Sequence, residues 1–317
     1  MQIRSVGASG LRVSALGLGT MTWGRQTSPD DAVEQLAVYL DAGGTLVDTA
    51  ASYGDGAAES ILGAALAGRS DRDEVVVSSK AGMGRRDPQT GRGVIDGSAR
   101  SLLNTLDASL TRLRMDHVDL WQVHVWDPGV PLDETCAALD AAVASGRTRY
   151  IGVSNYNGWQ VGSAAAWQRA WAGRAPLISN QVEYSLVRRA VEDDVVPACL
   201  HHGLGLLAWS PAAGGFLSGK YRGGVPSGSR GADERWQERF ALYGDAHGLR
   251  IVDAVATAAE GLGVSPLTVA LSWVRDRPAV SSVLVGARTP AQLKTALAAG
   301  TFDMPEQIRA ALDDVSA

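Results

Sequence analysis

The sequence lacks the features that mark disulfide-rich secreted proteins and membrane proteins. It has two cysteines, Cys136 and Cys199, which stand far apart in apolar helical stretches and form no CxxC motif. No disulfide framework is indicated, and we expect two buried, inert thiols. The opening MQIRSVGASG lacks the apolar core of a signal peptide, and no apolar run approaches the length of a membrane span. We therefore expect a cytoplasmic protein without a membrane partner.

An excess of positive charge is also absent. The 29 Lys and Arg residues are outnumbered by 34 Asp and Glu, which gives a net charge of −5, and there is no basic run. This balance argues against nucleic acid and anionic membranes as partners, so any anion must be bound locally. Hydrophobic residues make up 45% of the 317 residues, enough for a sizeable core.

Eight short apolar runs alternate with longer helical patterns. Most of the runs are continuously apolar, as expected of parallel strands buried on both faces. They lie at residues 15–20, 45–50, 74–80, 117–123, 149–155, 177–184, 205–210 and 280–286. Eight β–α units without a linker predict an α/β fold, a closed (β/α)₈ TIM barrel, in one domain spanning residues 1–317.

Helix ends carry their usual residues. Prolines are predicted in first helical turns at Pro29, Pro131 and Pro290. Glycines are predicted just past helix ends at Gly43, Gly146 and Gly203.

Two segments fall outside the eight units. Residues 2–14 read as two short strands around a glycine-containing turn, which predicts a hairpin that plugs the floor of the barrel. The connection from Pro211 to about Leu249, after the seventh strand, holds seven glycines between Gly214 and Gly231. Long loops in compact domains are usually functional, so we interpret this one as a strap over a ligand.

Polar residues interrupt the apolar runs mostly at one end, where barrel active sites gather, and the residues at those ends are candidates for the site. These residues are Asp48, Lys80, His124, Ser154, Asn155, Gln181, Trp209, Ser210 and Gly286, and Tyr53 follows Asp48 in the next loop.

Four of them form a predicted proton-transfer group. A tyrosine has a pKa of about 10, which a nearby lysine lowers by stabilising the phenolate. Asp48 supplies the counter-ion that a buried Lys80 needs, and His124 can donate to a substrate oxygen. Taken singly, each residue is better explained as a cap, as packing or as a solvated group. Their joint occurrence after the second, third and fourth runs favours a catalytic site.

The motifs around these residues resemble the aldo-keto reductase superfamily. GGTLVDTAASYGDGAAESILG at 43–63 is similar to the family signature, VVVSSKAG to its lysine strand and VDLWQVHVWDP to its histidine strand. YIGVSNY, ISNQVEYSL, LLAWSPAAGGFLSGKY and VLVGARTPAQL follow in the family's order. The resemblance runs from about Ala15 to Leu297.

The resemblance implies a barrel enzyme that uses NADPH to reduce an aldehyde or ketone. Tyr53 is then the general acid, tuned by Lys80 and Asp48, and His124 positions the carbonyl. No metal is implied.

The resemblance also implies a set of cofactor ligands. Ser154, Asn155 and Gln181 match ligands of the nicotinamide carboxamide, and Trp209 matches an aromatic residue that stacks on its ring. Further contacts are expected from Thr20, Met21, Ser210, Pro211 and Gly286.

The phosphate end of the cofactor has its own matches. Leu217, Gly219 and Lys220 match the loop over the pyrophosphate. Arg288, with Gln292 as neighbour, matches the position that meets the 2′-phosphate, which favours NADP over NAD because a guanidinium binds a phosphate through two hydrogen bonds. Thr295 and Ala296 replace a frequent Glu-Asn pair that touches adenine, which predicts weaker cofactor affinity.

Two tryptophans follow the first and fourth runs at the catalytic end. Trp23 and Trp126 are expected to line an apolar substrate pocket, with packing beneath the loops as the alternative.

Two segments resemble known binding motifs, a phosphate loop and a zinc site, but neither site is predicted here. Gly214 to Lys220 fits the start of a phosphate loop, but Tyr221 replaces the Ser or Thr that holds magnesium. His201 and His202 are adjacent on a helix and point in different directions, so they do not predict a zinc site.

Two other functions remain open. Some proteins with this barrel are NADP-binding, redox-sensing regulatory subunits of potassium channels. The barrel pattern here begins almost at residue 1, and we expect no extension that acts on such a partner. The same residues also serve an NADP-dependent alcohol dehydrogenase, so the sequence leaves the direction of reaction open.

Overall fold

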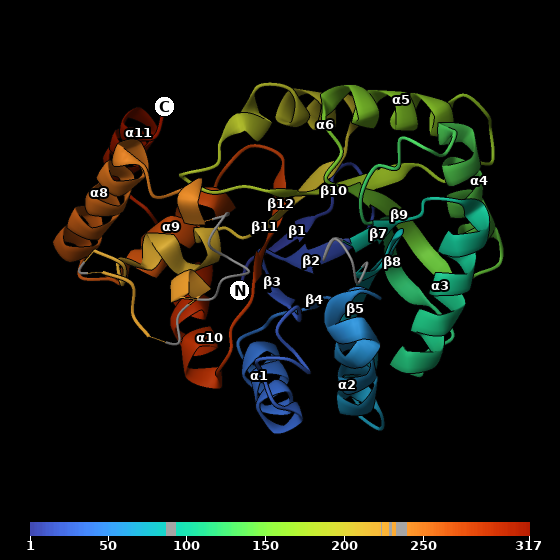
Figure 1. Cartoon of the computed structure of the whole chain (residues 1–317), viewed down its shortest axis with the longest axis horizontal. Coiled ribbons are helices and arrows are strands. Elements are labelled where there is room, and N and C mark those ends of the chain that lie inside the picture. The colour runs from blue at the N-terminus through green and yellow to red at the C-terminus, as the bar shows by residue number, and fades with distance from the viewer. Residues whose placement is uncertain (87–92, 223, 228–229, 233–239) are drawn as a thin grey trace.

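Eight parallel strands close into a barrel in the computed structural model, which describes residues 1–86, 93–222, 224–227, 230–232 and 240–317 (Figure 1). The strand order around the barrel is β10-β11-β12-β3-β4-β5-β8-β9. The bounds are β3 Leu16–Gly19, β4 Leu46–Asp48, β5 Val76–Ala81, β8 Val118–Val123, β9 Thr148–Ser154, β10 Leu177–Glu183, β11 Gly205–Trp209 and β12 Val280–Val285. Each predicted run overlaps one barrel strand, so the (β/α)₈ prediction is confirmed.

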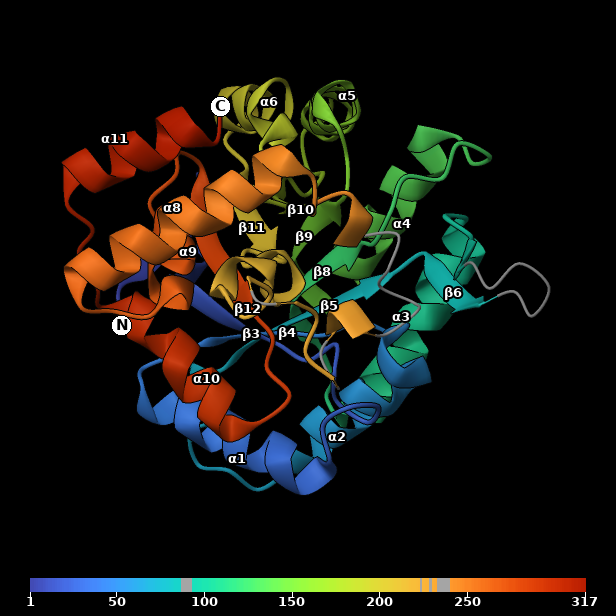
Figure 2. The ribbon, with the colours of Figure 1, turned by 60° about the vertical axis from the view of Figure 1, so that its left-hand side comes forward.

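Helices surround the barrel (Figure 2). They are α1 Pro29–Asp41, α2 Ala57–Leu66, α3 Ala99–Leu113, α4 Leu132–Ala144, α5 Gly158–Arg169, α6 Val195–His202, α8 Ala246–Leu262, α9 Pro266–Arg275, α10 Pro290–Leu297 and α11 Glu306–Val315. Among the described residues no single helix is long and apolar enough to cross a membrane. Helices α8 and α9 satisfy the criterion only as a pair, bent by 103°.

Local sequence signals set the helix ends. The N-cap of α1 is Ser28, whose hydroxyl accepts the Asp31 N–H at 3.1 Å. Pro29 and Pro290 begin α1 and α10 as predicted, whereas Pro131 is the N-cap of α4. The glycines predicted past the helix ends adopt the left-handed conformation, with φ of 76° at Gly43, 77° at Gly146 and 69° at Gly203.

The N-terminal segment forms the predicted hairpin. Strands β1 (Ile3–Ser5) and β2 (Arg12–Ser14) pair antiparallel. Val6, Leu11 and Val13 pack in one apolar cluster with barrel residues Leu46, Leu120, Ile178, Leu207 and Leu284. A Cβ added at Gly7 would lie 2.3 Å from the Gly203 carbonyl oxygen, so the turn fits against the barrel only with glycine. The hairpin therefore closes one end of the barrel.

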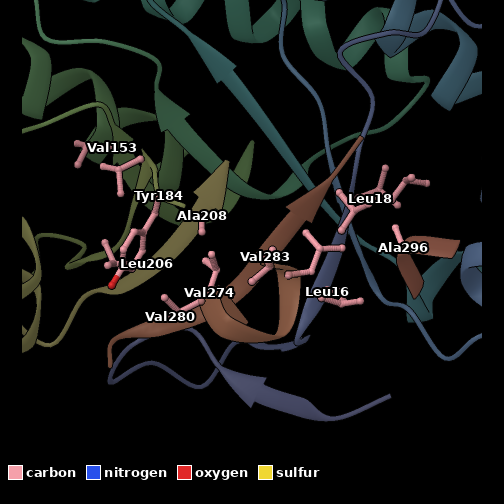
Figure 3. Close-up of a cluster of buried hydrophobic side chains, with 14 of the residues drawn as sticks. Leu16, Leu18, Val153, Tyr184, Leu206, Ala208, Val274, Val280, Val283 and Ala296 are labelled. Atoms are coloured by element: carbon pink, nitrogen blue, oxygen red, sulfur yellow. The ribbon is translucent and has the colours of Figure 1, made fainter. Parts of the chain in front are cut away.

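The main core lies between the strands and the helices (Figure 3). The part drawn in Figure 3 contains side chains of β3, β9, β11 and β12, and Tyr184 just after β10, together with residues of α9 and α10. Those labelled in Figure 3 are Leu16, Leu18, Val153, Tyr184, Leu206, Ala208, Val274, Val280, Val283 and Ala296. Burying one Leu or Val side chain contributes roughly 1.5–3 kcal/mol, so this core holds the strand ends in fixed positions.

Both cysteines are free and buried, as expected. Burial raises the pKa of Cys136 and of Cys199 to about 12, so both thiols stay protonated at neutral pH.

One hairpin was not predicted. Strands β6 (Met83–Arg86) and β7 (Gly93–Ile95) pair antiparallel after β5. They are too short and too polar to stand out as apolar runs.

The long connection after β11 begins with a turn of 3₁₀ helix, η4 (Ala213–Ser218). Phe216, Tyr221, Phe240 and Tyr243 gather in one aromatic cluster, with ring centroids 5.0 to 6.2 Å apart. Tyr243 is also hydrogen-bonded to Glu183 at the end of β10, so the connection is held to the barrel edge. Residues 223, 228–229 and 233–239 of the predicted strap lie outside the described part of the chain.

Candidate active site

Asp48, Lys80 and His124 lie at or just beyond the carboxyl ends of β4, β5 and β8, which are neighbours in the barrel. Tyr53 begins the 3₁₀ turn η1 (Tyr53–Gly56) that follows β4. Gly54, Asp55 and Gly56 all have positive φ, at 60°, 54° and 95°, so the chain turns tightly directly after Tyr53 and enters α2. The four predicted residues are therefore close together in the fold, although they are far apart in the sequence.

Lys80 is the centre of the group. Its Nζ donates to Asp48 Oδ2 at 2.6 Å and to the Thr49 carbonyl oxygen at 2.8 Å. Its third hydrogen bond goes to Tyr53 Oη at 3.2 Å. The Lys80 side chain is 0% exposed and that of Asp48 is 2% exposed. An ammonium has three donors, so this buried charge is fully paired, as burial requires.

Asp48 is held from its other side as well. Its Oδ1 accepts from Ser78 Oγ at 3.1 Å and from Gln181 Nε2 at 2.8 Å. With Oδ2 on Lys80, both carboxylate oxygens have donors inside the barrel. The carboxylate is therefore fixed in one orientation.

The pKa of Tyr53 differs in direction from the simple expectation. Burial raises it, while the nearby Lys80 charge lowers it and Asp48 raises it again, and the net pKa lies above the ordinary value. Lys80 lowers the pKa as expected, but desolvation of the phenol outweighs the effect of the ammonium. Tyr53 is thus a neutral phenol at neutral pH, the form that can donate a proton.

His124 completes the group. Its ring stands edge-on to the ring of Tyr53, with centroids 6.0 Å apart. Burial, together with the charge of Lys80, lowers the pKa of His124 to about 3, so the imidazole is neutral. Its Nδ1 is buried without a hydrogen-bond partner. A neutral imidazole offers one N–H, which suits donation to an uncharged carbonyl oxygen.

The residues predicted for the nicotinamide carboxamide are brought together beside this group. Ser154 Oγ donates to the Gln181 carbonyl oxygen at 2.8 Å. Asn155 Nδ2 donates to Ser154 Oγ at 3.1 Å and to the His124 carbonyl oxygen at 2.9 Å. Trp209 Nε1 donates to Asn155 Oδ1 at 3.1 Å. One hydrogen-bonded network thus joins the ends of β8, β9, β10 and β11.

Two residues of this edge have strained backbones. Asn155 and Ser210 have φ of 58° and 55°, in the left-handed region that non-glycine residues seldom adopt. Such conformations cluster at functional sites, where surrounding structure holds them. Here the hydrogen bonds of the Asn155 side chain, and the one that Ser210 Oγ accepts from the Gly214 N–H at 3.1 Å, supply that support.

The remaining predicted cofactor ligands differ in exposure. Thr20 is buried and its hydroxyl donates to the Asp48 carbonyl oxygen at 3.1 Å, and Pro211 is also buried. Met21 is 42% exposed, and Gly286 is exposed at the end of β12. Met21 and Gly286 are therefore open to solvent in this structure, whereas Thr20 and Pro211 are not.

The predicted pyrophosphate loop divides in the same way. Leu217 is fully buried, and its N–H donates to the Ala212 carbonyl oxygen at 3.2 Å. Gly219 ends η4 with φ of 78°, and Lys220 follows it as an exposed cation. Leu217 is therefore committed to packing, while Lys220 can meet an anion.

Arg288 and Gln292 form a small unit at the start of α10. The Arg288 N–H donates to Gln292 Oε1 at 3.0 Å, and the Gln292 N–H donates to Thr289 Oγ1 at 3.3 Å. Arg288 as a whole residue is half-buried. Its backbone N–H is tied to the first turn of α10, so the residue stands next to a helix N-terminus, where anions are favoured.

Residues 15–317 match the family model described as the aldo/keto reductase family. The chain belongs to the aldo/keto reductase family. An uncharacterized oxidoreductase of Bacillus subtilis, YrpG, is 35% identical over 99% of this chain and 96% of its own length. A probable voltage-gated potassium channel subunit beta of Oryza sativa subsp. japonica is 36% identical over 92% of this chain and 89% of that protein. L-glyceraldehyde 3-phosphate reductase of Escherichia coli is 34% identical over 93% of this chain and 86% of that protein.

The interpretation of Trp23 as a pocket residue is wrong in this aldo/keto reductase. Its side chain is 0% exposed, and its Nε1 donates to Gln35 Oε1 of α1 at 3.0 Å. The loop folds back on itself, because the Thr22 carbonyl oxygen accepts the N–H groups of Arg25, Gln26 and Thr27. This turn drives Trp23 into the core.

Trp126 lies differently and has a neighbour that was not predicted. Its half-buried ring packs edge-on against Tyr156 and against Trp159, each with centroids 5.2 Å apart. Trp159 is 61% exposed, in the first turn of α5. Trp159 follows Asn155 by four positions, and this closeness in sequence could have identified it as a residue near the site.

Three further polar residues of the barrel interior were missed. Ser78, Gln122 and Ser179 are fully buried and hydrogen-bonded in sequence toward Asp48. The signal was present, since each is a polar residue within a run predicted as a buried strand. Across the described residues no cluster of three or more metal-binding side chains occurs.

Proposed function

We propose that residues 1–317 form a single barrel enzyme that reduces an aldehyde or ketone to an alcohol with NADPH. The observation that carries the proposal is the buried ammonium of Lys80, bonded at once to Asp48, the Thr49 carbonyl and the Tyr53 phenol. A fully buried ion pair is costly, and attaching it to a phenol at the barrel mouth suits proton transfer better than it suits stability.

The residues present fit a nicotinamide dinucleotide. Two features support this fit: a buried, unpartnered Nδ1 on His124 beside the phenol, and an amide-rich network on the neighbouring strand ends. NADPH, when bound, supplies the hydride. Ser154, Asn155 and Gln181 would hold its carboxamide, and Trp209 would pack on its ring.

The phosphates of the cofactor need cations. Lys220 would meet the pyrophosphate and Arg288 the 2′-phosphate, with Gln292 beside it. Both cations follow adjacent barrel strands, β11 and β12. Arg288 offers the paired donors that distinguish a phosphate from a hydroxyl.

The side chains of the group divide the proton chemistry. His124, neutral, donates a hydrogen bond that orients the carbonyl oxygen. Tyr53 gives its proton to that oxygen, and Lys80 stabilises the phenolate that remains. Asp48 keeps Lys80 charged and in place. A positioned acid of this kind is worth roughly 10²–10⁴ in rate.

The substrate is proposed to be a small or medium carbonyl compound with an apolar or aromatic portion. Trp126, in the loop after β8, and Trp159, in the first turn of α5 after β9, provide aromatic surface beyond the strands that also lead to His124 and Asn155. We also propose a cytoplasmic location, which the two free thiols favour.

The deciding experiment is turnover by the purified chain. NADPH oxidation is followed with aliphatic, aromatic and charged-sugar carbonyls, and then again with NADH. We expect NADPH to be preferred and aromatic or apolar carbonyls to be reduced fastest. Preference for charged sugars alone would contradict the substrate class. The reverse assay, with alcohols and NADP⁺, decides the direction.

The similarity to a probable channel subunit supports a second candidate, an NADP-binding redox sensor. It predicts tight NADPH binding with negligible turnover for every carbonyl and alcohol, and co-purification with a membrane protein. Ready turnover with no such partner would exclude it.

A further inference from the structure

A chain of hydrogen-bonded side chains crosses the barrel interior and ends on Asp48. Ser179 Oγ donates to Gln122 Oε1 at 3.1 Å, and Gln122 Nε2 donates to Ser78 Oγ at 3.0 Å. Ser78 Oγ in turn donates to Asp48 Oδ1 at 3.1 Å. The four residues come from β10, β8, β5 and β4, and none is more than 2% exposed.

For the Asp48 carboxylate to receive its hydrogen bond from Ser78, every donor in this series of side chains must point toward Asp48. A hydroxyl has one proton, and an ionised carboxylate only accepts. Because Gln122 donates to Ser78, the hydroxyl proton of Ser78 is left for Asp48. Turning the Gln122 amide over would draw that proton to Gln122 and leave Asp48 one donor short.

Space for the chain is built into the neighbouring strand. A Cβ added at Gly152 of β9 would lie 2.1 Å from Ser179 Oγ and 3.3 Å from Gln122 Cγ. Any side chain at Gly152 would displace these two residues, so the interior is shaped around them.

The consequence for the reaction follows from the two oxygens of Asp48. Ser78 and Gln181 occupy Oδ1, which turns Oδ2 to Lys80 at 2.6 Å. Lys80 can then direct its remaining proton to Tyr53 at 3.2 Å. Without the Ser78 hydroxyl, Gln181 alone holds Oδ1, so the carboxylate is less restrained and can draw Lys80 away from the phenol.

We propose that Ser78, oriented by Gln122, is a positioning residue that sets the proton-donating power of Tyr53 through Asp48 and Lys80. This inference rests on the proposed role of Tyr53. It concerns residues that contact neither substrate nor cofactor, so their effect appears in the rate of the chemical step and not in binding.

The next residue provides a matched control. Ser79 is also fully buried, on the same strand, and its hydroxyl donates to the buried carboxylate of Glu59 at 2.6 Å. Glu59 pairs with Arg112, not with Lys80. Ser78→Ala and Ser79→Ala each remove one hydroxyl from a buried carboxylate, but only the first touches the ion pair next to Tyr53.

The experiment compares the single-turnover rates of both variants with NADPH and one good carbonyl substrate. Each rate is normalised to the concentration of NADPH-binding sites. We expect similar losses of Tm. Ser78→Ala should slow hydride transfer by about tenfold while KM and the NADPH Kd stay within about twofold, and Ser79→Ala should stay within about twofold in rate. Equal rates in the two variants would overturn the proposal.

A double-mutant cycle with Asp48→Asn tests the route. If Ser78 acts through the Asp48 charge, Ser78→Ala slows the Asp48→Asn enzyme by less than about twofold. A full tenfold loss in that background would also overturn the proposal. An active Tyr53→Phe enzyme would instead remove the proposed function, whereas an inactive Tyr53→Phe with a normal Ser78→Ala would remove the positioning role alone.

Discussion

The Nζ of Lys80 lies 3.2 Å from the phenol oxygen of Tyr53, although the two residues are 27 positions apart and belong to different β–α units. Burial raises the pKa of Tyr53, and Lys80 limits that rise. The phenol is therefore kept protonated, and the Lys80 cation beside it stabilises the phenolate once the proton has left. This is the arrangement of a proton donor, not of a base that starts ionised.

Replacing Tyr53 by Phe removes the proton donor and leaves the ring. We expect kcat to fall by at least about 10²-fold, with the Kd for NADPH, measured by tryptophan fluorescence quenching, changed by less than about threefold. Tyr39→Phe is the control. Tyr39 is fully buried and its hydroxyl bonds Ser14 and the Leu16 and Leu46 carbonyl oxygens, away from Lys80, so that variant should lose stability and keep its rate. Wild-type turnover in Tyr53→Phe would remove Tyr53 from the role.

Arg288→Ala tests the cofactor preference. A guanidinium–phosphate pair is charge-assisted, so its loss should raise the Kd for NADPH by about 10- to 100-fold and leave the Kd for NADH within about twofold. Lys294→Ala, which removes an exposed cation later in α10, controls for the change in net charge. Equal weakening of both cofactors by Arg288→Ala would refute the assignment.

His124 predicts a pH dependence of stability. Its pKa is about 3 in the folded protein, against 6.5 for an ordinary histidine, because burial and Lys80 disfavour the charged form. Below pH 6.5 the unfolded chain therefore binds a proton that the folded chain refuses. The stability is complete above that pH and is lost as the pH falls toward 3.

The contribution of His124 to the free energy of unfolding is measured by urea unfolding of wild type and His124→Gln at several pH values. Other groups titrate alike in both proteins and cancel. From pH 6.5 downward, wild type should lose about 1.4 kcal/mol per pH unit more than the variant. A difference that does not change with pH would show that His124 titrates normally in the fold.

The barrel could be predicted because its strands are continuous apolar runs separated by capped helices. Lys80 and His124 could be placed because parallel strands all end at the same edge. The details that failed depend on side-chain direction. Trp23 follows a strand end just as Trp126 does, yet hydrogen bonds to the Thr22 carbonyl turn its loop inward.

The interior polar chain shows a second limit. Ser78 and Ser79 are adjacent and chemically identical, and only the strand register decides which of them faces Asp48. That register, Asp48 beside Ser78, results from barrel closure and cannot be read from one strand. The balance of effects on the pKa of Tyr53 likewise depends on burial, which the order of residues does not contain.

The two tryptophans with opposite surroundings give the last prediction. Trp23→Ala empties a fully buried site and removes the partner of Gln35, so the free energy of unfolding should fall by about 3–5 kcal/mol. Trp159→Ala removes a ring that is 61% exposed, so stability should change by less than about 1 kcal/mol. If Trp126 and Trp159 contact the substrate, Trp159→Ala should raise KM several-fold for aromatic carbonyls and little for short aliphatic ones. Equal KM changes for both substrate classes would show that this aromatic pair does not select the substrate.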